Sequence, residues 1–477
     1  MRVSEYFKLG KTQPFLDFVD VRLDTDLPVF VDTGRLRSLQ STWGSECQSL
    51  LQDYFDTVLK HIKSENDGAA IALLSCLAES NDFHFGFSKG RSRGSGMGEG
   101  SARDVWGALT KSKASLTGLL QDLEDTCLLI DGIGPDRISD AVCNILRGPL
   151  IRYTQRACKY YGIPLTPDIE SGPIWNPSIE KWEDSLVPLP MTSYGRLILV
   201  PKIIVRHRVW YDSQEYYRHF LLPHMQSEEK RLNSGLVETL SDGRKRVTKT
   251  RLMLEYGADK LAVVEQTLKH PSVLDEYREA KKKKFPKAVD HNTLAEIENT
   301  SPPDFNKLLK KIKSIAPGKK EATTYENAIE ELFSALFYPS LTSPTKQFPI
   351  HNGRKRIDIK YVNSASAGFF HWLGMHYPCS HIFIECKNYV SDIANPELDQ
   401  MSSRFSPSRG QIGLLVCRTL DDREKFIERC KDTAHDSRGY IIPIDDSDLE
   451  ILIEDYEQHT QNQSFPSLRK LFTRLIT

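Results

Sequence analysis

The spacing of apolar residues along the chain predicts a mostly helical N-terminal third. Apolar side chains recur at helical intervals over four segments, 36–63, 68–80, 102–128 and 136–162. Between the second and the third of these, residues 85–100 are rich in glycine, which interrupts regular structure. We therefore expect residues 1–162 to form a mostly helical domain.

The middle of the chain, residues 163–317, combines strand and helix patterns. Residues 163–192 are rich in proline and lack periodicity, which is typical of irregular connections. A β-branched and aliphatic run at 196–211 predicts a strand, whereas helical patterns cover 211–226 and much of 247–314. These patterns predict an α+β region that ends in a helical linker. They leave open whether this region is a separate domain or continues the first.

The C-terminal part, residues 318–477, has a different rhythm, in which helices alternate with strands. Polar residues with proline and lysine near 315–322 predict the main domain boundary. A helix is expected at 323–337, followed by strands at 346–350, 355–362, 381–385, 411–419 and 439–445. Further helices are expected between and after them, at 396–405, 421–434 and 447–458. Helices that separate apolar strands predict an α/β domain with a mixed sheet flanked by helices.

Length, charge and cysteine content narrow the class of protein. A chain of 477 residues is too long for one ordinary core, so we expect two or three domains. Because the formal net charge is −1, any surface for nucleic acid has to be a local patch. The nine cysteines form no CxxC pair, as expected of free thiols in a reducing compartment. The sequence shows neither a signal peptide nor a membrane-spanning run, so we expect a cytoplasmic protein with no membrane contact.

Two predicted strands carry charged residues where buried strands should be apolar. Asp358 lies between two isoleucines of its strand. In the strand HIFIECK, alternation places Glu385 and Lys387 on the face opposite the isoleucines. If the two strands are neighbours, Asp358, Glu385 and Lys387 converge at one end of the sheet.

This set of side chains suits phosphodiester hydrolysis. Two close carboxylates repel each other unless a cation lies between them. Mg²⁺ accepts one or two carboxylates together with water and phosphate oxygens, and Mn²⁺ can replace it. Such a metal acidifies a bound water, and an adjacent ammonium can position that water or stabilise charge that develops on the phosphate.

These residues, together with the order of helices and strands around them, resemble the restriction-endonuclease-like PD-(D/E)xK nuclease superfamily. The superfamily core runs helix, three strands, helix, strand (αβββαβ), which is the order predicted for residues 321–445. The sequence looks most like Mrr-type and other bacterial restriction or phage-defence endonucleases, which carry ECKNY or a close variant after an apolar strand and a glutamine on the next helix. It departs from the pattern at Ile357, where proline is common, and by an insertion at 364–380.

The resemblance implies roles for individual residues. Asp358, Glu385 and a glutamate of the first core helix are the implied metal ligands, with Lys387 as the catalytic lysine. Glu326 is the best match for the helix glutamate, and Glu330, one turn later, remains the alternative. Asn388 of ECKNY and the helix residue Gln400 are implied to contact nucleic acid. The basic residues just before Asp358 are expected to do so from their charge and place; they are Arg354, Lys355 and Arg356.

The expected function is that of a Mg²⁺-dependent DNA endonuclease with an N-terminal sensing or targeting region. A role in restriction or anti-phage defence, with a partner protein, follows from family analogy alone. Cutting both strands of a duplex needs two active sites, which favours a homodimer or a higher oligomer. An RNA-cleaving nuclease and a catalytically silent nucleic-acid-binding module of the same fold remain alternatives.

Other motifs have plainer interpretations. The glycine-rich stretch 86–100 lacks the Walker and dinucleotide signatures and is expected to be a loop. Residues 130–142 are expected to form a turn and a helix start, and Lys281–Lys284 a solvated helix face. The histidines near 371–381 have irregular spacing, which does not favour zinc.

Overall fold

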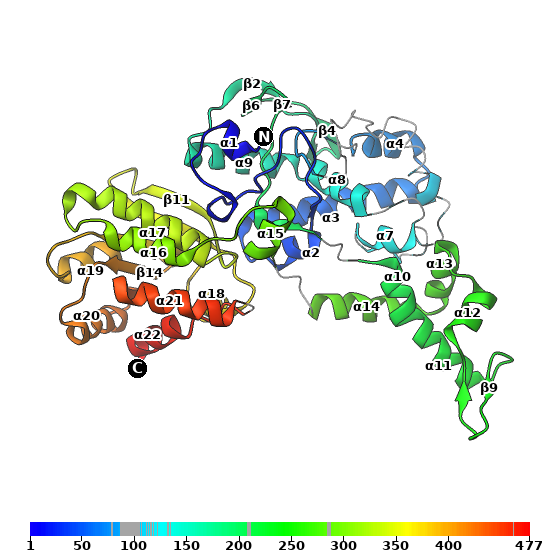
Figure 1. Ribbon diagram of the computed structural model, residues 1–477. Helices are drawn as coiled ribbons and strands as arrows, with labels where there is room; N and C mark the ends of the chain where they lie inside the picture. Colours follow the sequence, from blue (N-terminus) through cyan, green and yellow to red (C-terminus); the bar gives the residue numbers. More distant parts are fainter. Residues whose placement is uncertain are drawn as a thin grey trace.

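The computed structural model (Figure 1) contains two hydrophobic cores that follow each other along the chain. It describes all residues except 78–79, 86–104, 106, 111, 113, 115–116, 118, 122, 131–132, 134, 208–210, 284–287 and 461. The prediction for the glycine-rich stretch 86–100 and part of the lysine run 281–284 thus lie outside the described residues. The first core comprises side chains from Val3 to Ala288 together with Tyr338, and the second comprises side chains from Phe305 to Leu475.

The two cores divide the chain differently from the predicted domains. The middle region continues the first domain, because its buried side chains up to Ala288 belong to the first core. The boundary was predicted near 315–322, and helix α16 (Phe305–Ser314), which precedes it, already belongs to the second core. Its apolar side chains, such as Leu309 and Ile312, are buried beside helix α17 (Ala322–Leu336). The polar stretch between these helices is a connection within one domain.

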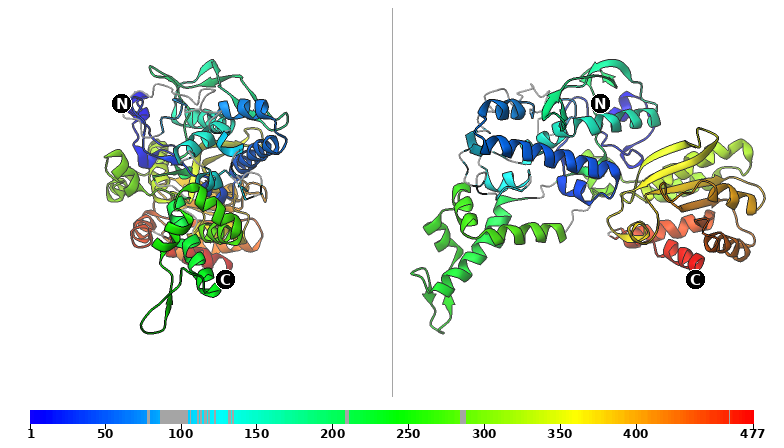
Figure 2. Two further views of the ribbon diagram at one scale, coloured as in Figure 1. Left: turned by 90° about the vertical axis from the view of Figure 1, so that its right-hand side faces the viewer. Right: turned by 180° about the vertical axis from the view of Figure 1, so that it is seen from behind.

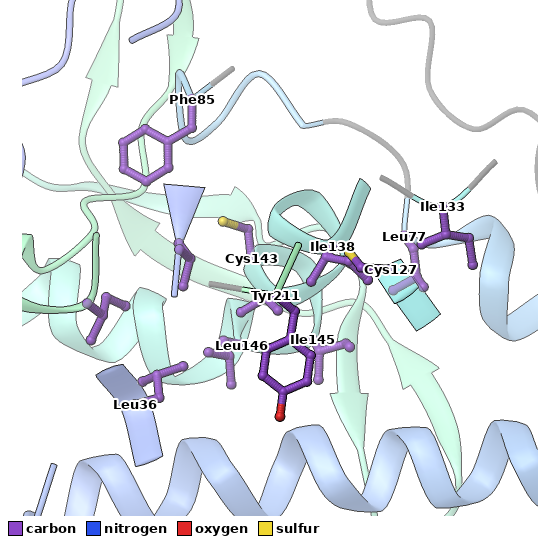
Figure 3. Packing of buried hydrophobic residues seen from close by; sticks show 14 of the residues in the cluster. Leu36, Leu77, Phe85, Cys127, Ile133, Ile138, Cys143, Ile145, Leu146 and Tyr211 are labelled. Atoms are coloured by element: carbon purple, nitrogen blue, oxygen red, sulfur yellow. The ribbon is translucent and has the colours of Figure 1, made fainter. Parts of the chain in front are cut away.

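The first core is built mainly from helices, as predicted. Its elements include α1 (Val3–Tyr6), α2 (Thr33–Ser38), α3 (Thr42–Lys63), α4 (Asp67–Ser75), α7 (Asp125–Leu129), α8 (Pro135–Ile145) and α9 (Arg147–Tyr161). Figure 3 shows Cys143 and Ile145 of α8 among the buried side chains of this core. All nine cysteines are free, as expected. Burial raises the pKa of the Cys143 thiol, so it behaves as an inert core residue.

Short antiparallel ladders follow where irregular chain was expected. They pair β2 (Thr166–Glu170) with β5 (Leu186–Leu189), β3 (Ile174–Asn176) with β4 (Lys181–Glu183), and β6 (Met191–Thr192) with β7 (Gly195–Arg196). Residues 196–211 were expected to contain a strand interrupted or edged by Pro201, and the strand found there is only two residues long. The run forms the 3-10 helix η2 (Lys202–Ile204) and the two-residue strand β8 (Val205–Arg206), which pairs with β1 (Phe30–Val31).

Residues 213–283 form an extension that we call the arm. It contains α10 (Ser213–Tyr216), η3 (Tyr217–Leu221), α11 (Leu222–Leu232), β9 (Glu238–Thr239), β10 (Lys245–Arg246), α12 (Lys249–Tyr256), α13 (Lys260–Lys269) and α14 (Pro271–Lys283). Figures 1 and 2 show the arm at one end of the molecule and the second core at the other. Helix α15 (His291–Glu298) lies between the arm and the second core in the sequence.

The second core surrounds a five-stranded mixed sheet, which confirms the expected mixed α/β class. Its strands are β11 (Leu341–Ile350), β12 (Lys355–Asn363), β13 (His381–Lys387), β14 (Ile412–Cys417) and β15 (Tyr440–Ile444), adjacent in that order. The first three are antiparallel, and β13, β14 and β15 run parallel. All six residues of β14 are buried, as expected of a central strand covered on both faces.

Helices cover the two faces of this sheet. The predicted helices are confirmed as α17, α19 (Asn395–Ser402), α20 (Arg423–His435) and α21 (Asp446–His459). Two further helices were not predicted, α18 (Gly368–His376) inside the insertion and α22 (Pro466–Ile476) at the end of the chain. Figure 1 shows α17 above the sheet and α22 below it. Among the described residues, no helix is long and apolar enough to cross a membrane.

Candidate active site

The register of two neighbouring strands brings the predicted carboxylates together. Strand β12 pairs with β13 in antiparallel register, with Ile359 opposite Ile384. Continuing that register by one residue sets Asp358 opposite Glu385. Side chains directly opposite each other in an antiparallel pair lie on the same face. The backbone N–H of Cys386 donates to Oδ2 of Asp358 at 3.0 Å, which fixes the carboxylate against the neighbouring strand.

Glu385 is buried and is held by two cations. Its side chain is 2% exposed. The Nζ of Lys387 donates to its Oε1 at 2.9 Å, and the guanidinium of Arg404 pairs with its Oε2. The same Nζ donates to Oε1 of Gln400 on α19, also at 2.9 Å. Three residues implied by the resemblance, Glu385, Lys387 and Gln400, are therefore joined in one hydrogen-bonded chain.

Arg404 belongs to this site although sequence reasoning did not select it. It follows α19 and lies four residues after Gln400, and its side chain is 8% exposed. Burial lowers the pKa of its guanidinium, and the negative charge of Asp358 opposes this shift. Arg404 thus interacts electrostatically with both site carboxylates. The only signal in the sequence was its spacing of one helical turn from Gln400.

Of the two candidate glutamates on α17, Glu326 is the one that interacts with Asp358. Glu326 accepts a hydrogen bond from Nε2 of Gln347 at 3.1 Å. Burial raises the pKa of Glu326, and the negative charge of Asp358 raises it further. Glu326 therefore lies close enough to Asp358 to interact with it, whereas Glu330 shows no such interaction.

Glu330 serves a different purpose, because it connects the two cores. It is 1% exposed, and Nζ of Lys11 from the N-terminal region lies 3.0 Å from its Oε2. Nζ of Lys346 lies 3.6 Å from the same oxygen. Burial raises the pKa of Glu330, but Lys11 and Lys346 more than offset this, so the pKa is lowered. Glu330 is therefore an ionised, buried ion-pair partner.

Four of the five residues expected to contact nucleic acid are exposed to solvent. Arg354, Lys355 and Arg356 are exposed in the turn between β11 and β12 and at the start of β12, just before Asp358. Gln400 is also exposed, in addition to holding Lys387.

The prediction for Asn388 is wrong. Its side chain is 2% exposed, and its amide donates to the carbonyls of Ala316 and Gly318, each at 3.0 Å. The backbone N–H of Gly318 donates in return to the backbone carbonyl of Asn388 at 2.7 Å. Both amide hydrogens are therefore used to fasten the connection between α16 and α17, and Asn388 supports the fold.

The donor chemistry of the site fits Mg²⁺ or Mn²⁺. Asp358 and Glu385 supply hard carboxylate oxygens on adjacent strands, and Mg²⁺ needs only one or two protein carboxylates because it keeps several waters. Among the described residues, no group of three or more histidine, cysteine, aspartate or glutamate side chains is arranged around a common centre. Lys387 and Arg404 balance the negative charge of Glu385 at this site.

Comparison with known proteins covers a different part of the chain. Residues 8–212 match a family model described as a domain of unknown function (DUF8370). This match includes most of the first core and ends where the arm begins. No curated protein and no solved structure matches the chain. The chemistry of the second core therefore has to be argued from its own geometry.

Proposed function

We propose that this protein is a metal-dependent endonuclease of the PD-(D/E)xK type that hydrolyses phosphodiester bonds of DNA. The observation that carries the proposal is the pairing of β12 with β13, which sets Asp358 beside Glu385 with Lys387 Nζ 2.9 Å from the latter. Apart from α18, which the insertion adds between β12 and β13, the order of α17, three antiparallel strands, α19 and β14 supports the αβββαβ core of that superfamily.

Each side chain has a definite task in this proposal. Asp358 and Glu385 would hold Mg²⁺ or Mn²⁺, with Glu326 contributing more weakly. When bound, the metal supplies an acidified water and neutralises charge on the phosphate. Lys387, whose position is fixed by Gln400, presents an ammonium that orients the attacking water or stabilises the developing negative charge. Arg354, Lys355 and Arg356 would hold the backbone of the substrate beside the site.

The buried charge of Glu385 is balanced by two cations of the chain. A buried carboxylate that lacks a partner is costly, and Glu385 is stabilised by Lys387 and Arg404. Arg404 also interacts electrostatically with Asp358, so its guanidinium would favour a substrate phosphate beside these two carboxylates.

The remaining parts of the proposal concern the biological setting. The first core and the arm would sense or target the nucleic acid, in a restriction or anti-phage role, and two copies of the chain would cut the two strands of a duplex. A partner protein of the same defence system would supply the trigger.

A cleavage assay with metal titration tests the proposal. Purified chain is incubated with duplex DNA, single-stranded DNA and RNA in Mg²⁺, in Mn²⁺ and in EDTA, beside the variants Asp358→Asn and Glu385→Gln. We expect metal-dependent cuts in duplex DNA that both variants lose, together with weaker Mn²⁺ binding by calorimetry. Cleavage of RNA alone would mean that the substrate is RNA and not DNA. Binding of nucleic acid without any cleavage would mean that the protein is a catalytically silent binding module.

A further inference from the structure

The tetrapeptide GRKR occurs twice in the chain, and both copies stand at the turn of a β-hairpin. One copy, residues 353–356, leads into Asp358 of the candidate active site. The other, residues 243–246, lies in the arm between β9 and β10. The two glycines have nearly the same left-handed backbone, with φ of +81° at Gly243 and +82° at Gly353. In both hairpins the three basic residues that follow are exposed.

The arm hairpin adds no buried surface to the protein. Its ladder pairs Lys245 with Thr239 and Arg246 with Glu238, and all four residues are exposed. An isolated two-stranded ladder is only marginally stable, so this one depends on its base. Just after β10, Val247 is 2% exposed and its carbonyl accepts from the side chain of Gln226 on α11 at 2.5 Å. The tip is therefore presented to solvent from a fixed base.

The charges at the tip are available to a partner. Arg244 pairs with Asp242 in the same turn, but both side chains are largely exposed, and such pairs are weak. Lys245 and Arg246 have no ion pair with any other described residue. The arm, residues 213–283, contains three more lysines and arginines (14) than aspartates and glutamates (11), although the whole chain has a net charge of −1. The arm is thus a local positive extension of a nearly neutral protein.

We propose that the tip of the β9–β10 hairpin binds the phosphate backbone of a nucleic-acid duplex, at a place separate from the cleavage site. The inference rests on the proposed nuclease function and extends it. Consecutive exposed cations without apolar neighbours favour a phosphate backbone, because a protein partner would need a buried apolar centre. Figures 1 and 2 show the hairpin and the second core at opposite ends of the molecule. A long duplex is therefore needed to occupy both places at once.

The test uses a triple variant and a matched control in the full chain. Arg244→Gln, Lys245→Gln and Arg246→Gln are combined, and the control combines Lys425→Gln, Arg429→Gln and Lys431→Gln on α20. The control removes the same charge from a helix that packs at β15, the sheet edge farthest from the β11–β12 turn. Both are made in a Lys387→Ala background, so that binding is measured without cutting. Affinity is recorded against salt concentration for duplexes of about 12 and about 60 base pairs.

The expected result separates this inference from the proposed function. The arm variant should bind the long duplex about tenfold more weakly at low salt, and the slope of log affinity against log salt should fall by about 2 to 3. The short duplex and the control should show neither effect. Equal affinity and slope for the arm variant and the control would overturn the inference, and so would a changed oligomeric state in light scattering without a binding defect. Failure of the parent chain to bind either duplex would instead count against the proposed function.

Discussion

At the scale of single residues, Lys387 is the side chain on which the proposed chemistry depends most directly. Its Nζ lies 2.9 Å from both Glu385 Oε1 and Gln400 Oε1, and no other ammonium of the described residues shares this position. Lys387→Ala should lower the cleavage rate by at least about 100-fold. Because Arg404 still neutralises Glu385, the thermal unfolding midpoint should stay within a few degrees of wild type. Lys425→Ala on the surface of α20 is the control, and wild-type cutting by the Lys387 variant would refute the assignment.

A second residue-scale prediction concerns Glu298 of α15, whose burial raises its pKa to about 7. A carboxyl whose folded-state pKa is raised binds its proton more tightly in the folded chain than in the unfolded one. The free energy of unfolding should therefore fall as pH rises from the ordinary glutamate pKa of about 4.3 to above 7. Glu298→Gln should remove that part of the pH dependence and stabilise the protein at pH 8 relative to wild type.

The Glu298→Gln variant suits this measurement, because the neighbouring Arg2 keeps its hydrogen bonds to two backbone carbonyls. Arg2 donates to the backbone carbonyls of Asp20 and Glu298, each at 2.8 Å, and the substitution leaves both bonds in place. Urea unfolding at pH 5.5 and pH 8 gives the comparison. A wild-type protein that gains stability over this range, with an unchanged pH profile in the variant, would show that Glu298 is ionised in the folded state.

At the scale of elements, helix α17 separates a site carboxylate from a structural one. Glu326→Gln should weaken Mn²⁺ binding and slow cleavage by about tenfold, because its carboxylate interacts with Asp358 without being a primary ligand. Glu330→Gln should instead destabilise the protein, by about 1 to 3 kcal/mol, because it leaves partly buried Lys11 and Lys346 without their anion. Thermal unfolding and metal titration of both variants show which glutamate belongs to the site and which stabilises the fold. The opposite pattern would make Glu330 the site carboxylate.

The elements that sequence reasoning predicted correctly are those whose pattern is local. Four of the five strands contain short apolar or alternating runs, and β11 was predicted only over 346–350 of Leu341–Ile350. Alternation placed Asp358 and Glu385 on their strand faces, and the pairing of β12 with β13 brings these faces together. The strand expected within 196–211 is short, because Pro201 caps a turn of 3-10 helix that buries Ile203 and Ile204 outside any ladder, and only Val205–Arg206 pairs with a neighbouring strand. An apolar run such as this one can be buried in several backbone conformations, so the pattern alone does not predict an extended strand.

The roles of Arg404 and Asn388 were not predicted correctly, because they depend on contacts with residues far away in the sequence. Arg404 reaches Glu385 across 19 positions of sequence, and its spacing from Gln400 is too weak a signal to distinguish it from other arginines. Asn388 was assigned to nucleic acid because it follows the strand end, but its amide fastens the connection at 316–318, which lies about 70 residues earlier in the chain. A motif can thus predict which residues gather at a strand end, and the packing around it decides which of them remain free for substrate.

At the scale of the whole molecule, the second core should fold without the first, provided that α16 is included. Four side chains of α16 complete that core, Phe305, Leu308, Leu309 and Ile312, and all are buried. Burying each contributes about 1.5 to 3 kcal/mol, so their sum rivals the whole stability of a typical domain, about 5 to 15 kcal/mol. A segment of residues 300–477 keeps these side chains and the N-terminal cap of α16, Asp304. A segment of residues 318–477 loses them.

We therefore predict that residues 300–477 unfold cooperatively in urea and bind Mn²⁺, whereas residues 318–477 are insoluble or lack a sharp transition. The longer segment loses the ion pair between Lys11 and Glu330 but retains Lys346 beside that carboxylate, so the separation leaves no bare buried charge. It should nick DNA weakly and without preference for long duplexes, because the arm is absent. Equal folding of the two segments would mean that α16 is dispensable to the second core. Failure of both would mean that contacts with the first core, such as the hydrogen bond from Ser343 N–H to Asp17 at 2.8 Å, hold the sheet together.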